Sequence, residues 1–324
     1  MLSVSHAVNM SASEAPDWRA ELADRLPRGA WRTRFAPAPT GYLHLGHLVN
    51  ALHVWGIARA HGGHVLLRIE DHDRSRCRPE FERVLLEDLE WLGFDAEIAP
   101  IASFRTQATP HPARQSDSED RYAHALALLA QRGLTYACEC TRRSVAEAAP
   151  HRPGEEPRYP GRCADGHVDP STTTARRVRI APGREFFDDV RLGRIEQEPA
   201  RQCGDVLIRD RAGSWTYQFA VTVDDMAQDI DVVIRGEDLL ASTGRQRQIA
   251  RLLGRADAPH VLHHALLVHA DGAKLSKANH DTALRERRGR GARAEDLLGE
   301  AAFLAGLTTS FAPITANDVA ALFR

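Results

Sequence analysis

Hydrophobic positions in the first third of the chain alternate between compact apolar runs and helical spacing. Residues 31–36 and 65–69 are short apolar runs bounded by turn residues, which is typical of buried strands. A helix between them is predicted by apolar residues at helical spacing, namely Leu48, Ala51, Leu52, Trp55 and Ala58. Pro79 opens a second amphipathic helix, which ends at Gly93. Strand, helix, strand and helix in this order predict a parallel sheet with crossover helices.

The middle of the chain has a different pattern. Residues 100–118 are polar and predict a connection, whereas 118–131 predict an amphipathic helix. Residues 133–170 combine three cysteines with many prolines and glycines and show little periodicity. That composition indicates a small module held together by something other than an apolar core. Short strands dominate the prediction for 176–223.

Alternating strands and helices are predicted again toward the C-terminus. A buried strand is expected at 231–234, followed by a helix that Ser242 or Thr243 caps. A further strand is expected from Leu266, leading into a turn and a loop. The last segment, 281–324, is predicted to be mostly helical.

Composition limits the class of protein. The 324 residues are 43% hydrophobic and 27% charged, as in an ordinary soluble globular protein. With a net charge of −2, any contact with nucleic acid has to come from a local basic patch. No apolar run is long enough to span a bilayer, and residues 1–30 lack a signal peptide and suggest a loose extension. We therefore expect no membrane association, a cytoplasmic location, and cysteines that are reduced thiols, metal ligands or core residues.

The lysines are the most unusual feature of the charge pattern. The chain has 42 basic residues, yet its only lysines are Lys274 and Lys277, in the short sequence Lys-Leu-Ser-Lys. A lysine ammonium is a compact charge on a flexible stem, so it can follow a phosphate as charge moves, which a planar guanidinium cannot. The alternative is a general preference for arginine that leaves two lysines on a solvated loop.

A histidine pair marks the first strand-to-helix junction. His44-Leu45-Gly46-His47 follows Arg34-Phe35-Ala36-Pro37-Ala38-Pro39-Thr40-Gly41. A helix N-terminus after a strand offers backbone amides and positive potential to an anion, and imidazoles there can donate to a phosphate. Gly46 would let a nucleotide approach the backbone closely. Two surface histidines at a helix start are the alternative explanation.

The two segments together resemble the His-Ile-Gly-His and Lys-Met-Ser-Lys-Ser signatures of class I aminoacyl-tRNA synthetases. Ala278 stands where the family has its last serine, so we assign it no role. The glutamate-specific branch is indicated by further similar segments, namely Arg34–Pro37, Arg68–Asp71, Arg114–Ser116, Tyr217–Asp225 and Arg235–Leu239. Within that branch the chain most resembles the glutamyl-queuosine tRNA(Asp) synthetases. That family attaches glutamate to the queuosine base in the anticodon of aspartate tRNA rather than to the 3′ end.

The resemblance implies a fold and a division of the chain. The fold is an α/β, Rossmann-like parallel sheet with an inserted zinc-bearing subdomain and a short helical C-terminal region. We expect the extension over 1–30 and the two halves of the nucleotide-binding domain at 31–110 and 205–280. The inserted subdomain is expected at 111–204 and the helical region at 281–324, with no anticodon-binding domain.

Zinc is implied by the same resemblance. The family's site matches Cys138, Cys140 and Cys163 with Tyr159 as the fourth ligand. Three thiolates are good zinc ligands, and closing such a site contributes folding energy. Tyr159 comes from the resemblance alone, and His167 and His151 are alternative fourth ligands. The cysteines could also be ordinary core thiols.

The resemblance also implies site residues for an ATP-dependent activation of L-glutamate. His44, Gly46, His47 and Lys277 would bind ATP, which is expected with Mg²⁺, and both histidines and both lysines would act in catalysis. The glutamate site would include the segment Phe35, Ala36, Pro37 and Ala38. By charge, Arg34 and Arg235 can clamp carboxylates, Glu70 can pair with the ammonium and Tyr217 can add a hydroxyl. The expected partners are ATP, glutamate and the anticodon loop of tRNA(Asp) carrying queuosine, and a monomer is expected.

Three other interpretations stay open on the sequence. The chain could be a shortened glutamyl-tRNA synthetase that charges the 3′ end. It could be another nucleotidyltransferase that makes an adenylate of a small acid without RNA. It could also be a non-enzymatic binding protein on a synthetase scaffold, although the intact histidines and lysines speak against this.

Overall fold

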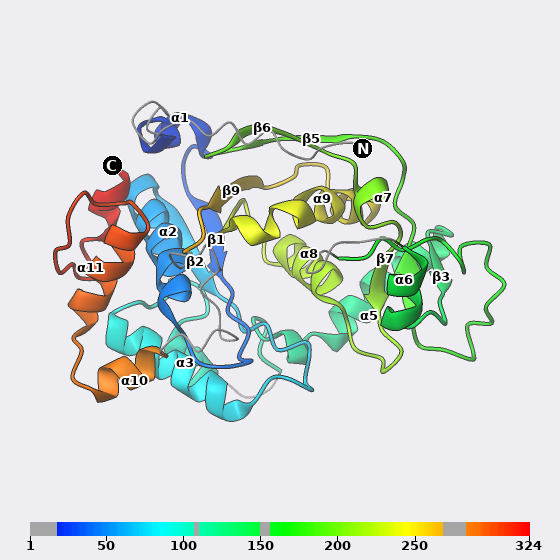
Figure 1. The fold of residues 1–324 in the computed structure, drawn as a ribbon, viewed down its shortest axis with the longest axis horizontal. Helices are drawn as coiled ribbons and strands as arrows, with labels where there is room; N and C mark the ends of the chain where they lie inside the picture. Colours follow the sequence, from blue (N-terminus) through cyan, green and yellow to red (C-terminus); the bar gives the residue numbers. More distant parts are fainter. Residues whose placement is uncertain (1–17, 107–109, 150–155, 268–282) are drawn as a thin grey trace.

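A parallel sheet forms the centre of the molecule in the computed structural model, which describes residues 18–106, 110–149, 156–267 and 283–324 (Figure 1). Strand β1 (Trp31–Phe35) pairs in parallel with β2 (Gly63–Leu67), and β8 (Val232–Gly236) pairs in parallel with β9 (His260–His264). The two pairs meet where the backbone amide of Asp231 donates to the carbonyl of Arg32 at 2.9 Å. The predicted α/β parallel-sheet fold is therefore confirmed.

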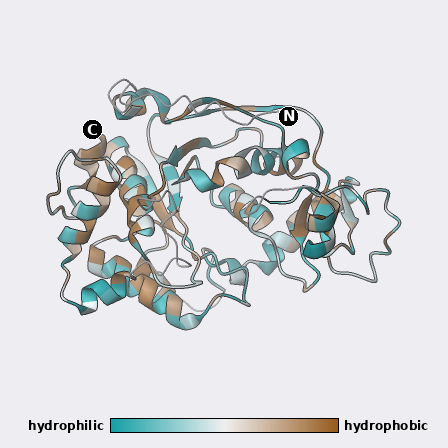
Figure 2. Ribbon diagram, viewed as in Figure 1, coloured by the Kyte–Doolittle hydropathy of each residue, from teal (hydrophilic) through white to brown (hydrophobic). Residues whose placement is uncertain are grey.

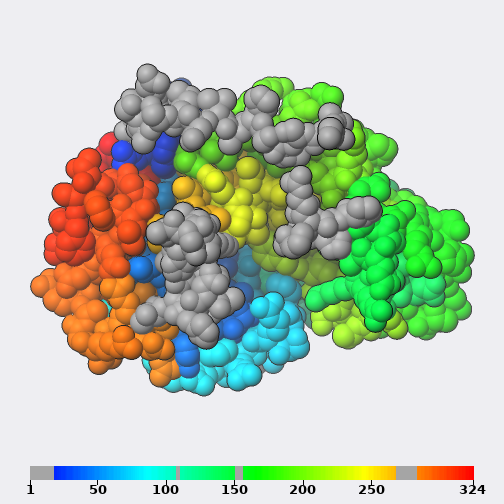
Figure 3. Space-filling view, in the orientation of Figure 1, coloured from blue at the N-terminus to red at the C-terminus, as the bar shows by residue number. Residues whose placement is uncertain are grey.

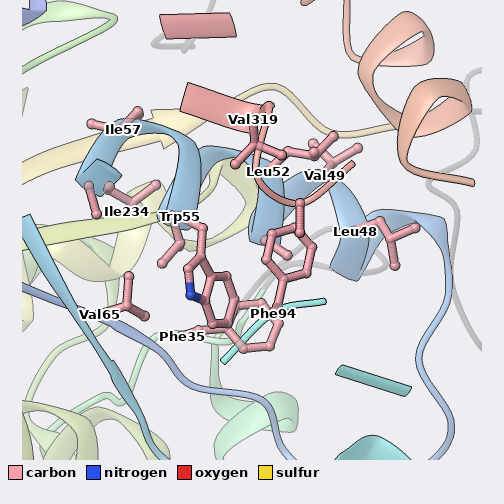
Figure 4. Packing of buried hydrophobic residues seen from close by; sticks show 14 of the residues in the cluster. Phe35, Leu48, Val49, Leu52, Trp55, Ile57, Val65, Phe94, Ile234 and Val319 are labelled. Atoms are coloured by element: carbon pink, nitrogen blue, oxygen red, sulfur yellow. The ribbon is translucent and has the colours of Figure 1, made fainter. Parts of the chain in front are cut away.

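Helices cover this sheet, namely α2 (Leu45–His61), α3 (Pro79–Leu92), α8 (Tyr217–Ala227) and α9 (Thr243–Leu252). Apolar spacing predicts all of them except α8. In the core, the Trp55 ring packs between Phe35 at 4.9 Å and Phe94 at 4.8 Å between ring centroids (Figure 4). All three side chains are almost completely buried, so the strand that precedes the histidine pair is anchored firmly.

The inserted module lies at the opposite end of the molecule from the C-terminal helices (Figures 1 and 3). Its antiparallel sheet consists of β3 (Thr135–Ala137), β4 (Arg176–Val178) and β7 (Val206–Arg209). The helices around it are α5 (Glu119–Gln131), α6 (Arg142–Ala148) and α7 (Pro199–Gln202). The cysteine-bearing segment has only a small cluster of buried apolar residues, as its composition predicts, whereas α5, β4 and β7 pack against α8 and α9 in a larger one.

Three strands lie in other sheets than the predicted division of the chain implies. Strands β5 (Glu185–Asp189) and β6 (Gly193–Gln197) were expected in the inserted subdomain, but β5 pairs in parallel with β9 and joins the central sheet. Strand β7 was expected in the second half of the nucleotide-binding domain, but it pairs with β4 in the module. Strand pairing over long sequence separations decides both cases, and local periodicity does not reveal it.

Several local elements also differ from the prediction. Helix α8 occupies a segment predicted as strand, because its run of alternating and β-branched residues favours either structure. The expected connection at 100–118 contains α4 (Ile101–Thr106) and a 3-10 turn, η2 (Gln115–Asp117). The 3-10 helix η3 (Glu237–Ser242) precedes α9, and β9 ends before Leu266, where a strand was expected to begin.

The described part of the N-terminal segment is not loose. The 3-10 helix η1 (Trp18–Glu21) and helix α1 (Leu22–Arg25) place Leu22 and Leu26 in the main core. At the other end, α10 (Leu284–Gly289), α11 (Ala294–Leu304) and η5 (Val319–Phe323) confirm the helical tail. Bands of apolar and polar residues alternate along α3 and α11, as expected of helices that cover a core (Figure 2). Among the described residues, no helix is both long and apolar enough to cross a membrane.

Candidate active site and cysteine cluster

The two histidines form the first turn of α2. The Nδ1 atom of His44 accepts from the amide of Gly46 at 3.1 Å, and Nδ1 of His47 accepts from the amide of His44 at 3.2 Å. The two rings lie 4.0 Å apart between centroids. A side chain at position 46 would place its Cβ 2.9 Å from the His44 ring, so only glycine fits this turn.

This geometry fixes the tautomers of both imidazoles. Because Nδ1 accepts a hydrogen bond in each ring, the proton of each neutral ring resides on Nε2. An Nε2 proton beside a helix N-terminus can donate to an anionic oxygen. The histidine pair is therefore built to hold a phosphate group.

Lys274 and Lys277 lie outside the described residues, as does His151. The described chain on either side of that segment returns to α2. Before it, Nε2 of His264 lies 3.2 Å from the Asn50 side-chain oxygen, and after it the amide of Leu284 donates to the carbonyl of Leu43 at 2.8 Å. The described residues on both sides of that segment therefore lie close to the start of α2.

Arg34 and Arg68 share one buried carboxylate. The Asp225 Oδ1 atom lies 3.2 Å from Nε of Arg34 and 2.8 Å from Nη1 of Arg68. Burial disfavours the ionised form of Asp225, but the two guanidinium charges outweigh it and hold its pKa below the usual value. Arg34 therefore already has a protein counter-charge, which reduces its capacity to clamp a substrate carboxylate as expected.

Arg235 lies at the end of β8 without such a counter-charge. Its guanidinium donates to Gln246 Oε1 at 2.8 Å, to Thr243 Oγ1 at 2.8 Å and to His263 Nε2 at 3.1 Å, all of them neutral acceptors. No carboxylate among the described residues forms an ion pair with it. Burial lowers the pKa of Arg235, as expected of a cation that lacks an anion.

His263 joins Arg235 to a second buried acid. Its Nδ1 donates to Oδ2 of Asp189 at 2.6 Å, while its Nε2 accepts from Arg235. Asp189 is held in turn by the amides of Arg191 and Leu192. Burial lowers the pKa of His263, so the ring stays neutral and its Nε2 can accept a hydrogen bond from Arg235. The chain Asp189–His263–Arg235 therefore orients the guanidinium.

The other predicted glutamate residues gather around this point, with two qualifications. Glu70 is buried and paired with Arg68 at 3.1 Å, and burial raises its pKa although Arg68 and Arg34 oppose this. Tyr217 interacts electrostatically with Glu70 and Arg235. The segment from Phe35 to Ala38 contributes backbone rather than charge. The side chain of Phe35 belongs to the core, so only its backbone can face a ligand. The carbonyl of Pro37 accepts from the amide of Glu70 at 3.1 Å, which fixes this turn. Ala36 and Ala38 are half-buried.

Sequence reasoning did not assign roles to the groups that hold these side chains. Asp225 and Arg68 were noticed only as parts of similar segments, and Thr243, His263 and Asp189 were not noticed as site residues. A usable signal exists for His263, because it directly follows the apolar pair Val261-Leu262 and stands beside a second histidine. Polar residues buried in strands need partners, so such a position is a reasonable candidate.

The three module cysteines do come together. The sulfur atoms of Cys138, Cys140 and Cys163 all lie within 4.8 Å of one another, and those of Cys140 and Cys163 are 3.7 Å apart. The Tyr159 hydroxyl lies 3.8 Å from the Cys138 sulfur and accepts from the Cys163 amide at 2.9 Å. These contacts favour Tyr159 over His167, which groups with Cys163 and Glu139 instead.

A positive charge is placed beside the cysteines. Arg177 Nε donates to the Cys138 sulfur at 3.3 Å, and its guanidinium lies 3.6 Å from the centre of the Tyr159 ring. Although burial opposes ionisation, this arginine keeps the pKa of the Cys138 thiol below its usual value. Burial and the Cys138 neighbour raise the pKa of Cys140 to about 11. Three sulfur donors and one oxygen at this spacing suit a tetrahedral zinc ion.

Comparison with known proteins assigns the chain to a family. Residues 30–309 match the catalytic domain of the class I tRNA synthetases for E and Q. The Glutamyl-Q tRNA(Asp) synthetase of Bordetella bronchiseptica is 44% identical over 258 residues, which cover 78% of this chain and 76% of that protein. That of Nitratidesulfovibrio vulgaris is 37% identical and covers 90% of this chain and 91% of its own length. The chain belongs to the glutamyl-Q tRNA(Asp) synthetase family.

Membership in the glutamyl-Q tRNA(Asp) synthetase family makes the chain a ligase of the aminoacyl-tRNA synthetase class and confirms the predicted resemblance. Solved structures agree on the fold. A glutamate tRNA ligase from Elizabethkingia meningosepticum in complex with its amino acid matches 90% of this chain with a TM-score of 0.71 at 24% identity. The glutamate-tRNA synthetase of Elizabethkingia anophelis matches with a TM-score of 0.72, also at 24%. This chain spans 64% and 65% of the length of those two proteins.

Proposed function

We propose that this protein activates L-glutamate with ATP and transfers the glutamyl group to the queuosine base in the anticodon of tRNA(Asp). The observation that carries the proposal is Arg235, a buried guanidinium at a strand end with neutral partners only. Parallel sheets bind ligands at the carboxyl ends of their strands, and an amino-acid carboxylate supplies the missing charge. The named substrates come from the relatives in the same family.

The first step is attack of a glutamate α-carboxylate oxygen on the α-phosphorus of ATP. The new acyl–phosphate bond forms as the bond to pyrophosphate breaks, which gives glutamyl-adenylate. His44 and His47 hold the phosphates through Nε2 protons at the start of α2. Lys277, with Lys274, is proposed to stabilise the leaving pyrophosphate, and Mg²⁺ bound with ATP neutralises phosphate charge. The protein contributes position and charge.

Glutamate is held by charge complementarity. Arg235 binds one carboxylate, and the Asp189–His263 pair keeps its guanidinium in place. Arg34 adds positive potential but is shared with Asp225. Glu70 accepts the ammonium, because an added cation favours the ionised form that burial opposes. Tyr217 interacts electrostatically with both Glu70 and Arg235, so its hydroxyl is proposed to contact the glutamate bound between them.

The second step uses a hydroxyl of queuosine as nucleophile. Its oxygen forms an ester bond with the activated carbonyl, the bond to AMP breaks, and the hydroxyl proton leaves to solvent. This requires the anticodon loop at the mouth of the site, where splayed bases and phosphates can meet arginines. A cytoplasmic, monomeric protein fits this proposal.

Zinc is proposed as a structural ion. Cys138, Cys140, Cys163 and Tyr159 would hold it, and its binding would order the module around β3 and β4. Arg177 offsets part of the negative charge of the sulfur ligands.

Pyrophosphate exchange tests the proposed function. We expect incorporation of labelled pyrophosphate into ATP with L-glutamate and no tRNA, and glutamate attachment only to tRNA(Asp) that carries queuosine. Exchange that requires tRNA, with charging of unmodified transcripts, would instead indicate a shortened glutamyl-tRNA synthetase. Folded protein without exchange under either condition would contradict the activation step.

A further inference from the structure

A basic cavity lies on the inserted module, next to the strand that leads to Cys138. Its volume is about 410 Å³, and its wall includes Arg176 of β4, Arg209 of β7 and Arg211 of the turn that follows. The opposite wall is the loop 170–174, which carries four successive hydroxyl groups on Ser171, Thr172, Thr173 and Thr174. Arginines and hydroxyls are the side chains that most often contact nucleic-acid phosphates.

The cavity is built by contacts within the protein. Thr174 Oγ1 donates to the carbonyl of Asp210 at 2.9 Å, which ties the loop to the turn. Arg176 donates to the carbonyls of Thr173 and Pro170 at 2.7 and 3.0 Å. Arg209 donates to the carbonyl of Gly213 at 2.9 Å and its guanidinium lies 4.7 Å from the centre of the Trp215 ring. Two of the three arginines are therefore held in position before any ligand arrives.

The cavity also has excess positive charge. None of the residues in its wall is acidic. The neighbouring Asp210 and Asp169 each accept from backbone amides of their own turns. Of the three arginines, Glu119 pairs only with Arg209, at 3.4 Å. Arg211 is exposed and has no hydrogen-bond or ion-pair partner among the described residues, so its guanidinium is available to an anion.

We propose that this cavity binds backbone phosphates of the RNA substrate, in the stem of the anticodon arm. This inference rests on the proposed function, which places the anticodon loop at Tyr217. Arg211 is six residues before Tyr217, so their Cα atoms are at most about 22 Å apart. Phosphates along a helical strand rise by about 3.4 Å per base pair in DNA, so a short stem spans that distance. With a net charge of −2, the protein needs such a local patch to hold RNA at all.

Substitution of Arg211 gives the cleanest test, because nothing in the fold depends on it. The zinc-loaded, full-length protein is titrated with a fluorescent anticodon stem–loop RNA of tRNA(Asp) at several salt concentrations. We expect Arg211→Gln to weaken binding about 3- to 10-fold and to reduce the slope of log affinity against log salt by about 1. Arg211→Glu should weaken binding further. Arg293→Gln is the matched control, since it removes an exposed arginine from the opposite end of the molecule and should change neither quantity.

Pyrophosphate exchange on the same proteins separates this inference from the proposed function. Wild-type affinity and salt slope in both Arg211 variants would overturn the phosphate site, and so would a wild-type protein that binds no stem–loop RNA at low salt. A wild-type protein without glutamate-dependent exchange, but with RNA binding that depends on Arg211, would refute the activation chemistry and support the phosphate site. Unchanged exchange and thermal unfolding in Arg211→Gln are expected.

Discussion

The strand-end cluster and the cysteine cluster both bury unbalanced charge, but with opposite signs. The strand-end cluster contains three arginines, Arg34, Arg68 and Arg235, and two carboxylates, Glu70 and Asp225. The cysteine cluster offers three sulfur ligands and a single compensating cation, Arg177. A third buried carboxylate, Asp189, reaches Arg235 only through the neutral His263 ring, so Arg235 has no direct anionic partner. The second region becomes strongly negative if its thiols ionise. Isolated buried charge is costly, so each region is expected to bind the ion that it lacks.

The pKa directions within the first region locate the excess. Although burial opposes its charge, Asp225 and Glu70 raise the pKa of Arg68, whereas burial lowers that of Arg235. The pKa values of Arg68 and Arg235 thus shift in opposite directions, because Arg68 has direct carboxylate partners and Arg235 does not. Arg235, at the end of β8, is therefore the arginine without a direct carboxylate partner, and a carboxylate ligand is expected there.

Removal of the metal should have the largest effect. Structural zinc contributes on the order of 10 kcal/mol in small metal-dependent domains, and the cysteine-bearing segment of the module has only a small apolar cluster. We expect Cys140→Ser or chelation to abolish stoichiometric zinc and to expose amides of the module to rapid hydrogen exchange. Protection of β1, β2 and α2 should persist.

Cys77→Ser is the matched control, because Cys77 lies outside the cluster and is half-buried. It should leave the zinc content unchanged. Full zinc content in Cys140→Ser, or unchanged protection of the module after chelation, would mean that the cysteines are ordinary core thiols.

Arg235→Gln should have the next largest effect. Loss of a buried charge that pairs with a carboxylate costs about 3–5 kcal/mol, so kcat/KM for glutamate in pyrophosphate exchange should fall by at least about 100-fold. Arg251→Gln provides a comparison, since Arg251 is exposed and pairs with Glu185. This substitution should change kcat/KM for glutamate little. An Arg235→Gln enzyme with the wild-type KM for glutamate would contradict the assignment of the carboxylate site.

The sequence predicts the ligand-facing residues better than the residues that position them. The histidine turn, Arg235 and the three cysteines are identifiable because their residue types and spacing suit phosphate, carboxylate and zinc. Asp225, Asp189 and His263 contact their partners Arg34, His263 and Arg235 across 28 to 191 positions of the chain. Such partners depend on which strands become neighbours, and the same long-range pairing placed β5, β6 and β7 in unexpected sheets.

Asp88 is a buried carboxylate outside both clusters, so it tests how much a buried charge without a counter-ion destabilises the fold. This carboxylate on α3 is buried, and its Oδ2 has no hydrogen-bond partner. Burial raises its pKa to about 6, with Arg288 opposing. The folded state therefore binds the proton more tightly than the unfolded state, so this residue destabilises the protein as the pH rises from about 4 to about 6.

The Asp88→Asn variant should remove that penalty. Its free energy of unfolding should equal that of the wild type near pH 4 and exceed it by up to about 3 kcal/mol at pH 7. Denaturant unfolding at a series of pH values measures the difference. Glu87→Gln, on the same helix but exposed, is the control for loss of a surface carboxylate. A pH-independent difference for Asp88→Asn would show that Asp88 ionises normally.

His263 should give the smallest effect, and the one that most directly tests how the strand-end cluster is positioned. His263→Asn can still donate to Asp189 but is too short to accept from Arg235, whereas His263→Gln retains an acceptor at the Nε2 position. One neutral hydrogen bond contributes about 1 kcal/mol, so KM for glutamate should rise about 5-fold in the asparagine variant and less in the glutamine variant, with kcat nearly constant. Because burial keeps His263 neutral, the ratio of KM values should not change between pH 6 and pH 8. A fall in kcat at constant KM would instead place His263 in the chemical step, and Arg235 would then be positioned by Thr243 and Gln246 alone.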